Sequence, residues 1–195
     1  MAATTARSSA AERRSSQDLR LIERVRDGDM EAFEELYRAY HPGMTRFVAN
    51  LVRRPMLIEE VVNDTMIVVW EKAGSFNGAS KLSTWMFAIA YRKAMRALRR
   101  FDEAMEDTHA ERRPSLNPSP EEEMTHGRAA RMLAKAMESL SPDHRTVVNL
   151  TYFHEKDYRE IAAIMGCPVD TVKTRMFHAR RHLRRLLGGE LADWV

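Results

Sequence analysis

A cationic stretch near the carboxyl end, VDTVKTRMFHARRHLRRL (residues 169–186), carries a phenylalanine among its basic side chains. Read with helical spacing, Phe177 lies in line with Lys173 and Arg180 rather than with the apolar residues. A ring beside cations is a poor solvent face, but it suits a DNA groove, where cations contact guanine or phosphate and a ring meets a thymine methyl group. The opposite, apolar face of the helix can be buried, and it consists of Val172, Met176, Ala179, Leu183 and Leu186.

The preceding segment, YREIAAIMGCPVD, has the layout of the first half of a helix-turn-helix. Ile161, Ile164 and Met165 can bury a short helix that Asp157 caps, and Gly166 allows the positive φ that the turn needs. In such motifs the amino-terminal residues of the second helix reach base edges in the major groove. The outward face of that second helix holds the candidate DNA contacts, which are Lys173, Thr174, Phe177, His178 and Arg181.

A second candidate site is FNGASKLSTWMFAIAYRKAMRALRR, residues 76–100, in which a polar loop and several aromatic residues precede a basic helix end. Aromatic rings stack on unpaired bases while cations hold the backbone, so this segment could bind single-stranded nucleic acid. Apolar spacing alone already explains Trp85 and Phe87, and core packing is the better interpretation of these two rings. The basic end is harder to assign to structure.

The hydrophobic pattern predicts an all-α protein, because strand alternation is hard to find and turn signals stand far apart. Asp18 and Asp170 are expected to cap the first and last helices, and Pro42 is expected to kink or break the second. Helices are predicted over about 18–28, 29–53, 55–74, 81–100, 128–140, 141–153, 157–166 and 169–186.

The helices group into two small bundles joined by a flexible acidic linker. The linker has eight acids and two arginines, a net charge of −6, so the rest of the chain carries +9 although the total is only +3. Basic surface of this kind favours a polyanionic partner. The predicted parts are a disordered tail (1–16), an amino-terminal bundle (17–100), the linker (101–127), a carboxy-terminal helix-turn-helix bundle (128–187) and a short tail (188–195).

Several functional classes are disfavoured by what the sequence lacks. No apolar run approaches a membrane span, the start has no secretory signal, and the lone Cys167 indicates a reducing cytoplasm. An enzyme is not expected, since there is no P-loop, nucleotide-binding glycine fingerprint or paired carboxylate site. His178 and His182 could ligate zinc with Cys167, but they lie on a helix otherwise suited to DNA, so neither a metal nor a cofactor is predicted.

Three segments together resemble the sigma-70 family of bacterial RNA polymerase sigma factors, in its compact extracytoplasmic-function (ECF) subgroup. They are GDMEAFEELYRAYHPGMTRFV, IEEVVNDTMIVVWEKAGSFNGASKLSTWMFAIAYRKA and LSPDHRTVVNLTYFHEKDYREIAAIMGCPVDTVKTRMFHARRHLRR, in the family's order and spacing. The resemblance covers residues 17–100, as sigma region 2, and 128–187, as sigma region 4. It implies an alternative sigma factor that brings core polymerase to promoters through −35 and −10 recognition and promotes melting.

The resemblance also implies roles for individual residues. The helix that binds the polymerase clamp would include Ile58, Glu59, Val61, Val62, Asp64, Thr65 and Trp70. Contacts to the −10 element would come from Asn77, Ser83, Thr84, Trp85, Tyr91, Arg92 and Arg96. The carboxy-terminal bundle would bind the polymerase flap and read the −35 element with Lys173, Thr174, Arg175, Phe177, His178 and Arg181.

Control by an external anti-sigma factor is expected, because the chain has no obvious sensory extension and many ECF relatives are held in this way. A stand-alone helix-turn-helix regulator is the main alternative. That class would share the carboxy-terminal motif, but it needs a sensor or dimerisation module, and the amino-terminal bundle carries no signal of either.

Overall fold

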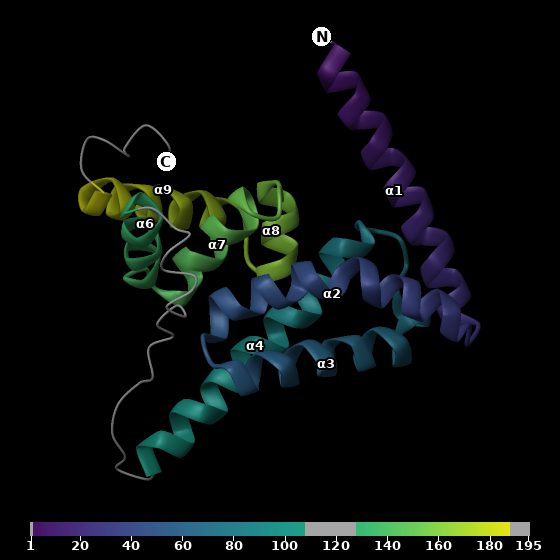
Figure 1. The fold of residues 1–195 in the computed structure, drawn as a ribbon, viewed down its shortest axis with the longest axis horizontal. Coiled ribbons are helices and arrows are strands. Elements are labelled where there is room, and N and C mark those ends of the chain that lie inside the picture. Colours follow the sequence, from purple (N-terminus) through teal and green to yellow (C-terminus); the bar gives the residue numbers. More distant parts are fainter. Residues whose placement is uncertain (1, 108–127, 188–195) are drawn as a thin grey trace.

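The computed structural model describes residues 2–107 and 128–187, with side chains over 13–103 and 132–187. Every regular element in these ranges is a helix, so the all-α prediction is confirmed (Figure 1). In chain order the elements are α1 (Ala2–Arg26), α2 (Met30–Val52), α3 (Pro55–Glu71), the 3-10 turn η1 (Ala73–Ser75), α4 (Leu82–Asp107), α6 (Arg128–Glu138), α7 (Pro142–Tyr152), α8 (Tyr158–Met165) and α9 (Val169–Leu187).

The amino-terminal bundle consists of α1 to α4, and α2 is its central element, in contact with the other three helices (Figure 1). The Asp29 carboxylate caps α2 by accepting hydrogen bonds from the backbone N–H groups of Glu31 and Ala32, at 3.0 and 3.1 Å. These N–H groups have no partner within the helix, so the cap satisfies them. The buried face of α2 follows helical spacing and includes Leu36, Tyr40, Met44, Phe47 and Leu51.

Pro42 lies inside α2 without ending it. A kink or break is predicted there, because proline lacks an N–H and its ring clashes with the preceding turn. The break does not occur, since the helix is continuous across the proline. Tyr40 and Met44 anchor both sides of Pro42 to the same core, and the eight buried residues of α2 together outweigh the ~3 kcal/mol that an internal proline costs.

The first helix is longer than predicted. It begins at Ala2, so the interpretation of residues 1–16 as a disordered tail is corrected over 2–16. Alanine and arginine make up eight of these fifteen residues and favour helix, which accounts for the extension. Asp18 consequently lies within α1 and caps nothing, and its carboxylate instead accepts a 2.6 Å hydrogen bond from the Tyr40 hydroxyl.

The fourth helix also continues past its predicted end, through residues 101–107. The Arg54 guanidinium lies 3.3 Å from the ring centre of Phe101, and this cation–π contact ties the extension to the start of α3. The first part of the predicted linker is therefore helical. The rest of it, 108–127, lies outside the described residues, as does the predicted tail over 188–195.

The helix caps predicted for the carboxy-terminal bundle are confirmed at every position except Asp170. Ser141 caps α7, and Asp157 forms a capping box with Glu160 at the start of α8. Gly166 ends α8 with a φ of +65°, the left-handed conformation that glycine adopts without strain. Asp170 lies within the first turn of α9, because the helix already begins at Val169, so it is not the predicted cap.

One buried arginine joins the corner of this bundle to the other bundle. Arg145 is 8% exposed, and its guanidinium donates to the backbone carbonyls of Met137, Leu140 and Glu138 at 3.2, 2.8 and 3.3 Å. The carbonyls of Met137 and Glu138 lie in the last turn of α6 and that of Leu140 just beyond it, where helical hydrogen bonds run out. A fourth hydrogen bond, of 3.3 Å, runs to the carbonyl of Asn50 in α2.

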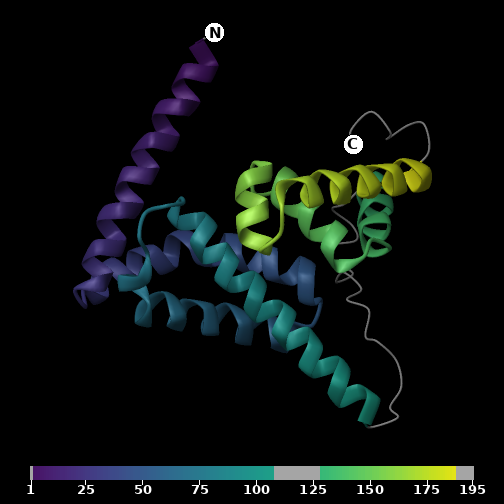
Figure 2. The same ribbon diagram turned by 180° about the vertical axis from the view of Figure 1, so that it is seen from behind.

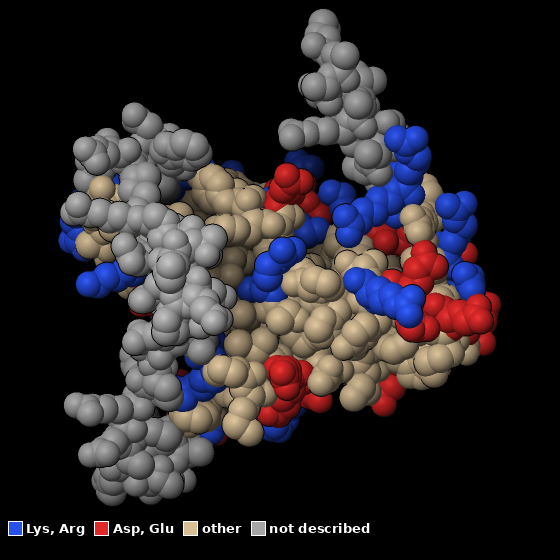
Figure 3. Space-filling view, viewed as in Figure 1, with Lys and Arg blue, Asp and Glu red and all other residues tan. Residues whose placement is uncertain are grey.

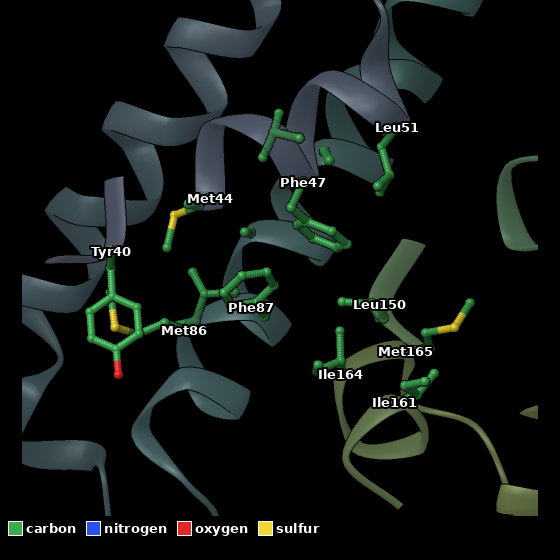
Figure 4. Close-up of a cluster of buried hydrophobic side chains, with 14 of the residues drawn as sticks. Tyr40, Met44, Phe47, Leu51, Met86, Phe87, Leu150, Ile161, Ile164 and Met165 are labelled. Carbon is green, nitrogen blue, oxygen red and sulfur yellow. The ribbon is translucent and has the colours of Figure 1, made fainter. Parts of the chain in front are cut away.

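The two bundles pack directly against each other, which the prediction of a flexible tether did not foresee. α7 contacts α2, and α8 lies beside α4 (Figure 2). Figure 4 shows Phe47 and Phe87 of the first bundle close to Leu150 and Ile164 of the second. The buried side chains of both bundles belong to one continuous hydrophobic core.

Candidate nucleic-acid interface

The predicted helix-turn-helix is formed by α8 and α9, with a tight turn at Gly166 between them. The predicted apolar stripe of α9 is buried except at its last position, where Leu187 takes the place of Leu186, which is 44% exposed. The stripe fixes the helix on its bundle, so the opposite face is free to meet a ligand. The buried residues are Val172, Met176, Ala179, Leu183 and Leu187.

Polar candidates lie on the exposed first turns of α9. Lys173 Nζ is 2.9 Å from Asp170 Oδ1, and both side chains are well exposed. The Thr174 hydroxyl donates to the Asp170 carbonyl oxygen at 2.9 Å. An exposed ion pair of this kind is worth under about 1 kcal/mol, so DNA phosphate can readily displace the carboxylate from Lys173.

Phe177 is 63% exposed and stands beside His178, with ring centroids 5.5 Å apart and an edge-to-face geometry. No core packing accounts for its ring, which presents an apolar surface to solvent amid cations. Arg181 is exposed one turn further along the same helix. The solvent face of α9 therefore combines an aromatic ring with hydrogen-bond donors, as base readout requires.

Arg175 differs from the other −35 candidates because it is half-buried and engaged. Its guanidinium forms an ion pair with Asp143 of α7, and Nη1 lies 3.5 Å from the sulfur of Cys167. Asp143 also accepts a 3.2 Å hydrogen bond from the hydroxyl of Tyr91, a −10 candidate on α4. Burial, and next the Asp143 charge, raise the pKa of Tyr91 to about 12, so the phenol stays a hydrogen-bond donor.

The loop before α4 leaves part of the −10 candidate set open. Asn77 is exposed, and its side-chain oxygen accepts from the Ala79 N–H at 3.0 Å, which shapes the turn. Trp85 is half-buried, with its ring centroid 5.5 Å from that of Phe76. The prediction of core packing therefore holds only in part for Trp85, because this residue remains partly exposed. It holds fully for Phe87, which is 5% exposed.

Arg92 and Arg96 lie one turn apart on α4, and both are exposed. Arg96 and Arg100 line a groove between α3 and α4, together with Asp64 and Glu60. Cations spaced one turn apart along a helix suit successive phosphates of a nucleic-acid strand.

The remaining −10 candidates, Ser83 and Thr84, face the other bundle rather than solvent. Lys156 Nζ donates to the Ser83 hydroxyl at 2.6 Å, and the Thr84 hydroxyl donates to Glu160 at 2.8 Å. Burial alone would raise the pKa of Glu160, but the hydrogen bond from Thr84 and the charge of Lys156 hold it below its usual value. Both hydroxyls are therefore occupied by charged partners.

The predicted clamp-binding residues all lie on α3, where some are buried and others are accessible. The side chains of Ile58, Val61, Val62 and Thr65 are buried, and the Thr65 hydroxyl donates to the Val61 carbonyl at 2.7 Å. These four residues hold the helix on its bundle and do not face a partner. The accessible or partly accessible members are Glu59, Asp64, whose carboxylate is 2.9 Å from Lys93 Nζ, and Trp70, which packs on Phe33.

Comparison with known protein families accounts for both bundles. A family model of sigma-70 region 2 matches residues 36–103, and one of sigma-70 region 4 matches residues 130–183. The chain belongs to the sigma-70 family. Sigma factors are non-catalytic initiation factors that bind core RNA polymerase and promoter DNA, so the chain is not an enzyme.

Individual relatives place this sigma factor in the ECF group. It is 31% identical to the ECF RNA polymerase sigma-E factor of Haemophilus influenzae, over 84% of this chain and 91% of the relative. It is 30% identical to the RNA polymerase sigma factor CarQ of Myxococcus xanthus, over 86% and 95%. The structure resembles that of the sigma factor RpoE in complex with the anti-sigma factor NepR from Bartonella quintana, with a TM-score of 0.69, 26% identity and coverage of 81% and 98%.

The sigma factor has accessible residues on α3 that the predicted clamp-binding set does not include. Met56 is 87% exposed and Ile67 is 53% exposed, and Asn63 is exposed between them. Their spacing places them on one helical face, opposite the buried one. Periodicity alone identifies this face, whereas four of the seven positions that the resemblance gave are buried.

Charge is distributed in separate clusters on the face of the sigma factor that Figure 3 shows. Basic side chains alternate with acidic ones, most densely around α1 and α2, and do not merge into one field. Among the described residues that are visible in this view, the basic side chains form no continuous track for a nucleic-acid strand.

No group of three or more metal-ligating side chains that could hold an ion is found among the residues the structure describes. Of the side chains in the zinc alternative, His182 Nε2 is paired with the Ser139 hydroxyl at 2.8 Å, and Cys167 Sγ lies 3.5 Å from Arg175 Nη1. Within the same described ranges, no helix is both long and apolar enough to cross a membrane.

Proposed function

We propose that this sigma factor divides promoter recognition between its two bundles, with α9 reading the −35 element and α4 with its preceding loop capturing the −10 element. The observation that carries the proposal is Phe177, which is 63% exposed on the solvent face of a helix whose apolar stripe is already buried. A solvent-facing phenylalanine among cations does not contribute to core packing. Its ring can instead contact the methyl group of a thymine in the major groove.

At the −35 element, the exposed residues of α9 divide by chemistry. Lys173 donates to guanine or phosphate, Thr174 offers a hydroxyl and a methyl group, and Phe177 contacts thymine. His178 and Arg181 extend the surface along the helix toward the backbone. Arg175 joins this set only after it leaves Asp143.

At the −10 element, Asn77, in the exposed loop before α4, and Trp85, half-buried in the first turn of α4, would receive an unpaired base. Arg92 and Arg96 then hold the non-template strand along α4. Ser83, Thr84 and Tyr91 complete the site once their hydroxyls are released from the other bundle.

Core polymerase is proposed to bind on both bundles. The clamp contacts the solvent face of α3, through Glu59 and Asp64 together with the exposed residues Met56 and Ile67. Trp70 supports the end of this face by packing on Phe33. The flap binds the carboxy-terminal bundle.

We further propose that an anti-sigma factor controls this protein in the bacterial cytoplasm. The structural relative from Bartonella quintana is described in complex with the anti-sigma factor NepR, and the present chain aligns with 98% of it. An inhibitor of this kind would act by covering surfaces that polymerase or DNA needs.

The experiment that tests the proposal is reconstitution with bacterial core polymerase on a promoter library, scored by run-off transcription. A defined set of promoters sharing −35 and −10 elements is expected. If no library member yields a transcript, the proposal fails. Strong, specific duplex binding by the free protein, without polymerase, would instead favour the stand-alone helix-turn-helix regulator.

A further inference from the structure

A cavity of about 700 Å³ is lined by α1 and α2 of the first bundle and by the loop between α7 and α8 of the second. Its volume falls within the range of about 300–1,000 Å³ that is usual for small-molecule sites. Of the residues that line it, only Ser83 belongs to the sets proposed to contact promoter DNA or polymerase. The proposed function therefore leaves this cavity unexplained.

Cationic side chains dominate the lining of this cavity. Four cations and two acids line it, which leaves a net charge of +2. The acids are Asp18 and Glu155, and the carboxylate of Asp18 is already engaged by the Tyr40 hydroxyl at 2.6 Å. The cations come from four separate segments of the chain, and they are Arg14, Arg46, Lys81 and Lys156.

The two arginines of the cavity lack carboxylate partners. Among the described residues, neither Arg14 nor Arg46 forms an ion pair, and the Arg14 guanidinium instead lies over the Tyr40 ring, 5.8 Å from its centre. Both arginines are exposed. Their guanidinium groups are therefore available to a ligand, and the planar fork of an arginine matches the oxygens of a phosphate group.

The two lysines of the cavity share one acid. Lys81 and Lys156 reach the Glu160 carboxylate at 3.3 and 3.2 Å, so a single negative charge serves both ammonium groups. The cations stay in excess when Glu160 is counted with the lining. Burial lowers the pKa of Lys156, Glu160 opposes this effect, and the charges of Lys81 and Arg14 lower the pKa further. These like charges repel one another, and a bound anion would relieve the repulsion.

Aromatic rings lie beside these cations. Tyr152 and Phe153 both line the cavity, and they are 43% and 63% exposed. The Tyr152 hydroxyl accepts hydrogen bonds from Nε and Nη2 of Arg180, at 3.1 and 2.7 Å, which hold its ring in place. An exposed ring of fixed orientation beside cations suits a ligand that carries both an aromatic base and phosphate groups.

The turn that follows these rings is strained. Glu155 has a φ of +50°, a left-handed conformation that residues other than glycine rarely adopt. A 2.9 Å hydrogen bond from the Lys156 N–H to the Leu150 carbonyl fixes the turn. Backbone strain of this kind is concentrated at binding sites, and here the strained turn brings Tyr152, Glu155 and Lys156 to one cavity.

We propose that this cavity is a binding site for a nucleoside polyphosphate, with the phosphates among the cations of the first bundle and the base against the Tyr152 ring. The phosphates contact Arg14, Arg46 and Lys81. Glu155 accepts hydrogen bonds from the ribose hydroxyl groups, as acidic residues do in other nucleotide sites. The ligand thus contacts both bundles, and its binding is a property of the free chain that does not rest on the proposed function.

Calorimetric titration of the free chain tests the proposal, with ATP, GTP and inorganic tripolyphosphate as probes. At least one of the nucleotides is expected to bind with a Kd of about 100 μM or lower. Tripolyphosphate should bind at least about fivefold more weakly, although its charge is no smaller, because it lacks a base to stack on Tyr152. Absence of binding by both nucleotides at about 1 mM, or equal affinity for tripolyphosphate, would overturn the proposal.

Two substitutions at exposed positions separate the phosphate contacts from the base contact. Arg46→Gln should weaken the binding of nucleotide and of tripolyphosphate about tenfold, because it removes a phosphate contact. Tyr152→Ala should weaken only nucleotide binding, by about fivefold, since it removes the ring and frees the Arg180 cation. Circular dichroism and thermal unfolding establish that each variant is folded.

The matched control is Arg38→Gln, which makes the same change on the same helix at an exposed residue outside the cavity lining. Its affinity for nucleotide should equal that of the unsubstituted protein. Equal losses in Arg38→Gln and Arg46→Gln would indicate a general attraction to basic surface and reject the site. Unchanged nucleotide affinity in Tyr152→Ala would reject it as well.

Photolabelling locates the bound nucleotide. An azido-substituted analogue of whichever nucleotide binds, cross-linked by light and mapped by mass spectrometry, should label the segment 152–156. Labelling confined to α9 would place the nucleotide on the DNA-facing helix and overturn the proposal. These measurements need neither polymerase nor promoter, so absence of transcription would reject the proposed function alone, and absence of nucleotide binding would reject the nucleotide site alone.

Discussion

Tyr91 of α4 donates a 3.2 Å hydrogen bond to Asp143 of α7, and this contact joins the two bundles of the sigma factor. Since the same carboxylate pairs with Arg175, one acidic side chain holds a candidate from each promoter-reading surface. The position of Asp143 in the second place of α7 follows from the Ser141 cap, so local helix chemistry sets the geometry of a contact between bundles. A residue outside both DNA-facing sets thus contacts one member of each.

Replacement of Phe177 by alanine should impair −35 recognition without lowering stability. The ring is 63% exposed, so its loss should change the free energy of unfolding by no more than about 0.5 kcal/mol. Loss of a thymine contact should reduce transcription from −35-dependent promoters about tenfold, the equivalent of ~1.4 kcal/mol. Phe153→Ala is the matched control, since Phe153 is also 63% exposed but lies in the α7–α8 loop. Equal losses in the two variants would remove Phe177 from base readout.

Lys173→Ala should weaken −35-dependent initiation while leaving affinity for core polymerase unchanged. Its ammonium is exposed and pairs with the exposed Asp170, so the substitution costs little stability. If Lys173 contacts a phosphate, the slope of log affinity against log salt should fall by about 1, with similar weakening across sequences. A base contact would instead relax specificity at one position. Reduced affinity for core polymerase would contradict the division of roles between the bundles.

Arg145→Met should destabilise the carboxy-terminal bundle by about 2–4 kcal/mol. The substitution removes the guanidinium that donates to the carbonyls at and just beyond the end of α6, and it removes the link to Asn50 in α2. Denaturant unfolding of the full chain measures the loss, and Arg159→Met, at an exposed position of α8, is the control. A loss no larger than the control's would show that water satisfies these carbonyls equally well.

Local sequence signals predicted the elements of this fold well. Ser141, Asp157 and Gly166 were recognised as caps because each acts within a few residues of its own position in the chain. The apolar stripe of α9 was found for the same reason, with an error of one residue at its end. The start of α1 was missed because helix propensity without an apolar period resembles a disordered tail.

Contacts between bundles could not be predicted in the same way. Nothing near Asp143 or Lys156 in the sequence indicates a partner some 50 to 75 positions earlier. The candidate site was accordingly predicted as two open surfaces, whereas the structure places Ser83, Thr84, Tyr91 and Arg175 in the interface. Four of the seven predicted clamp-binding residues are buried in their own bundle. The resemblance identifies the helix that is proposed to bind the clamp, but it does not show which face of that helix is buried.

Acidification should open the bundles through His154. Burial, and next the cations of Arg46 and Lys156, lower the pKa of His154 to about 4, so the closed arrangement prefers the neutral ring. In an open or unfolded state the ring titrates near its ordinary value of about 6.5. Because the pKa is depressed in the closed state, the stability that His154 contributes is present above pH ~6.5 and is lost as the pH falls toward 4.

The expected result is a fall in energy transfer between fluorophores attached at two exposed positions, Met30→Cys in α2 and Ala163→Cys in α8, in a Cys167→Ser background, when the pH is lowered from 7 to 5. Burial raises the pKa of Asp18, which lies near Lys156, so the His154→Gln comparison is what separates the histidine from this carboxyl. The His154→Gln variant, which cannot titrate, should lose this dependence while the other histidines remain. If the dependence persists unchanged in His154→Gln, a different group opens the interface and the edge-on packing of His154 against Phe47 and Phe87 is not the acid-sensitive contact.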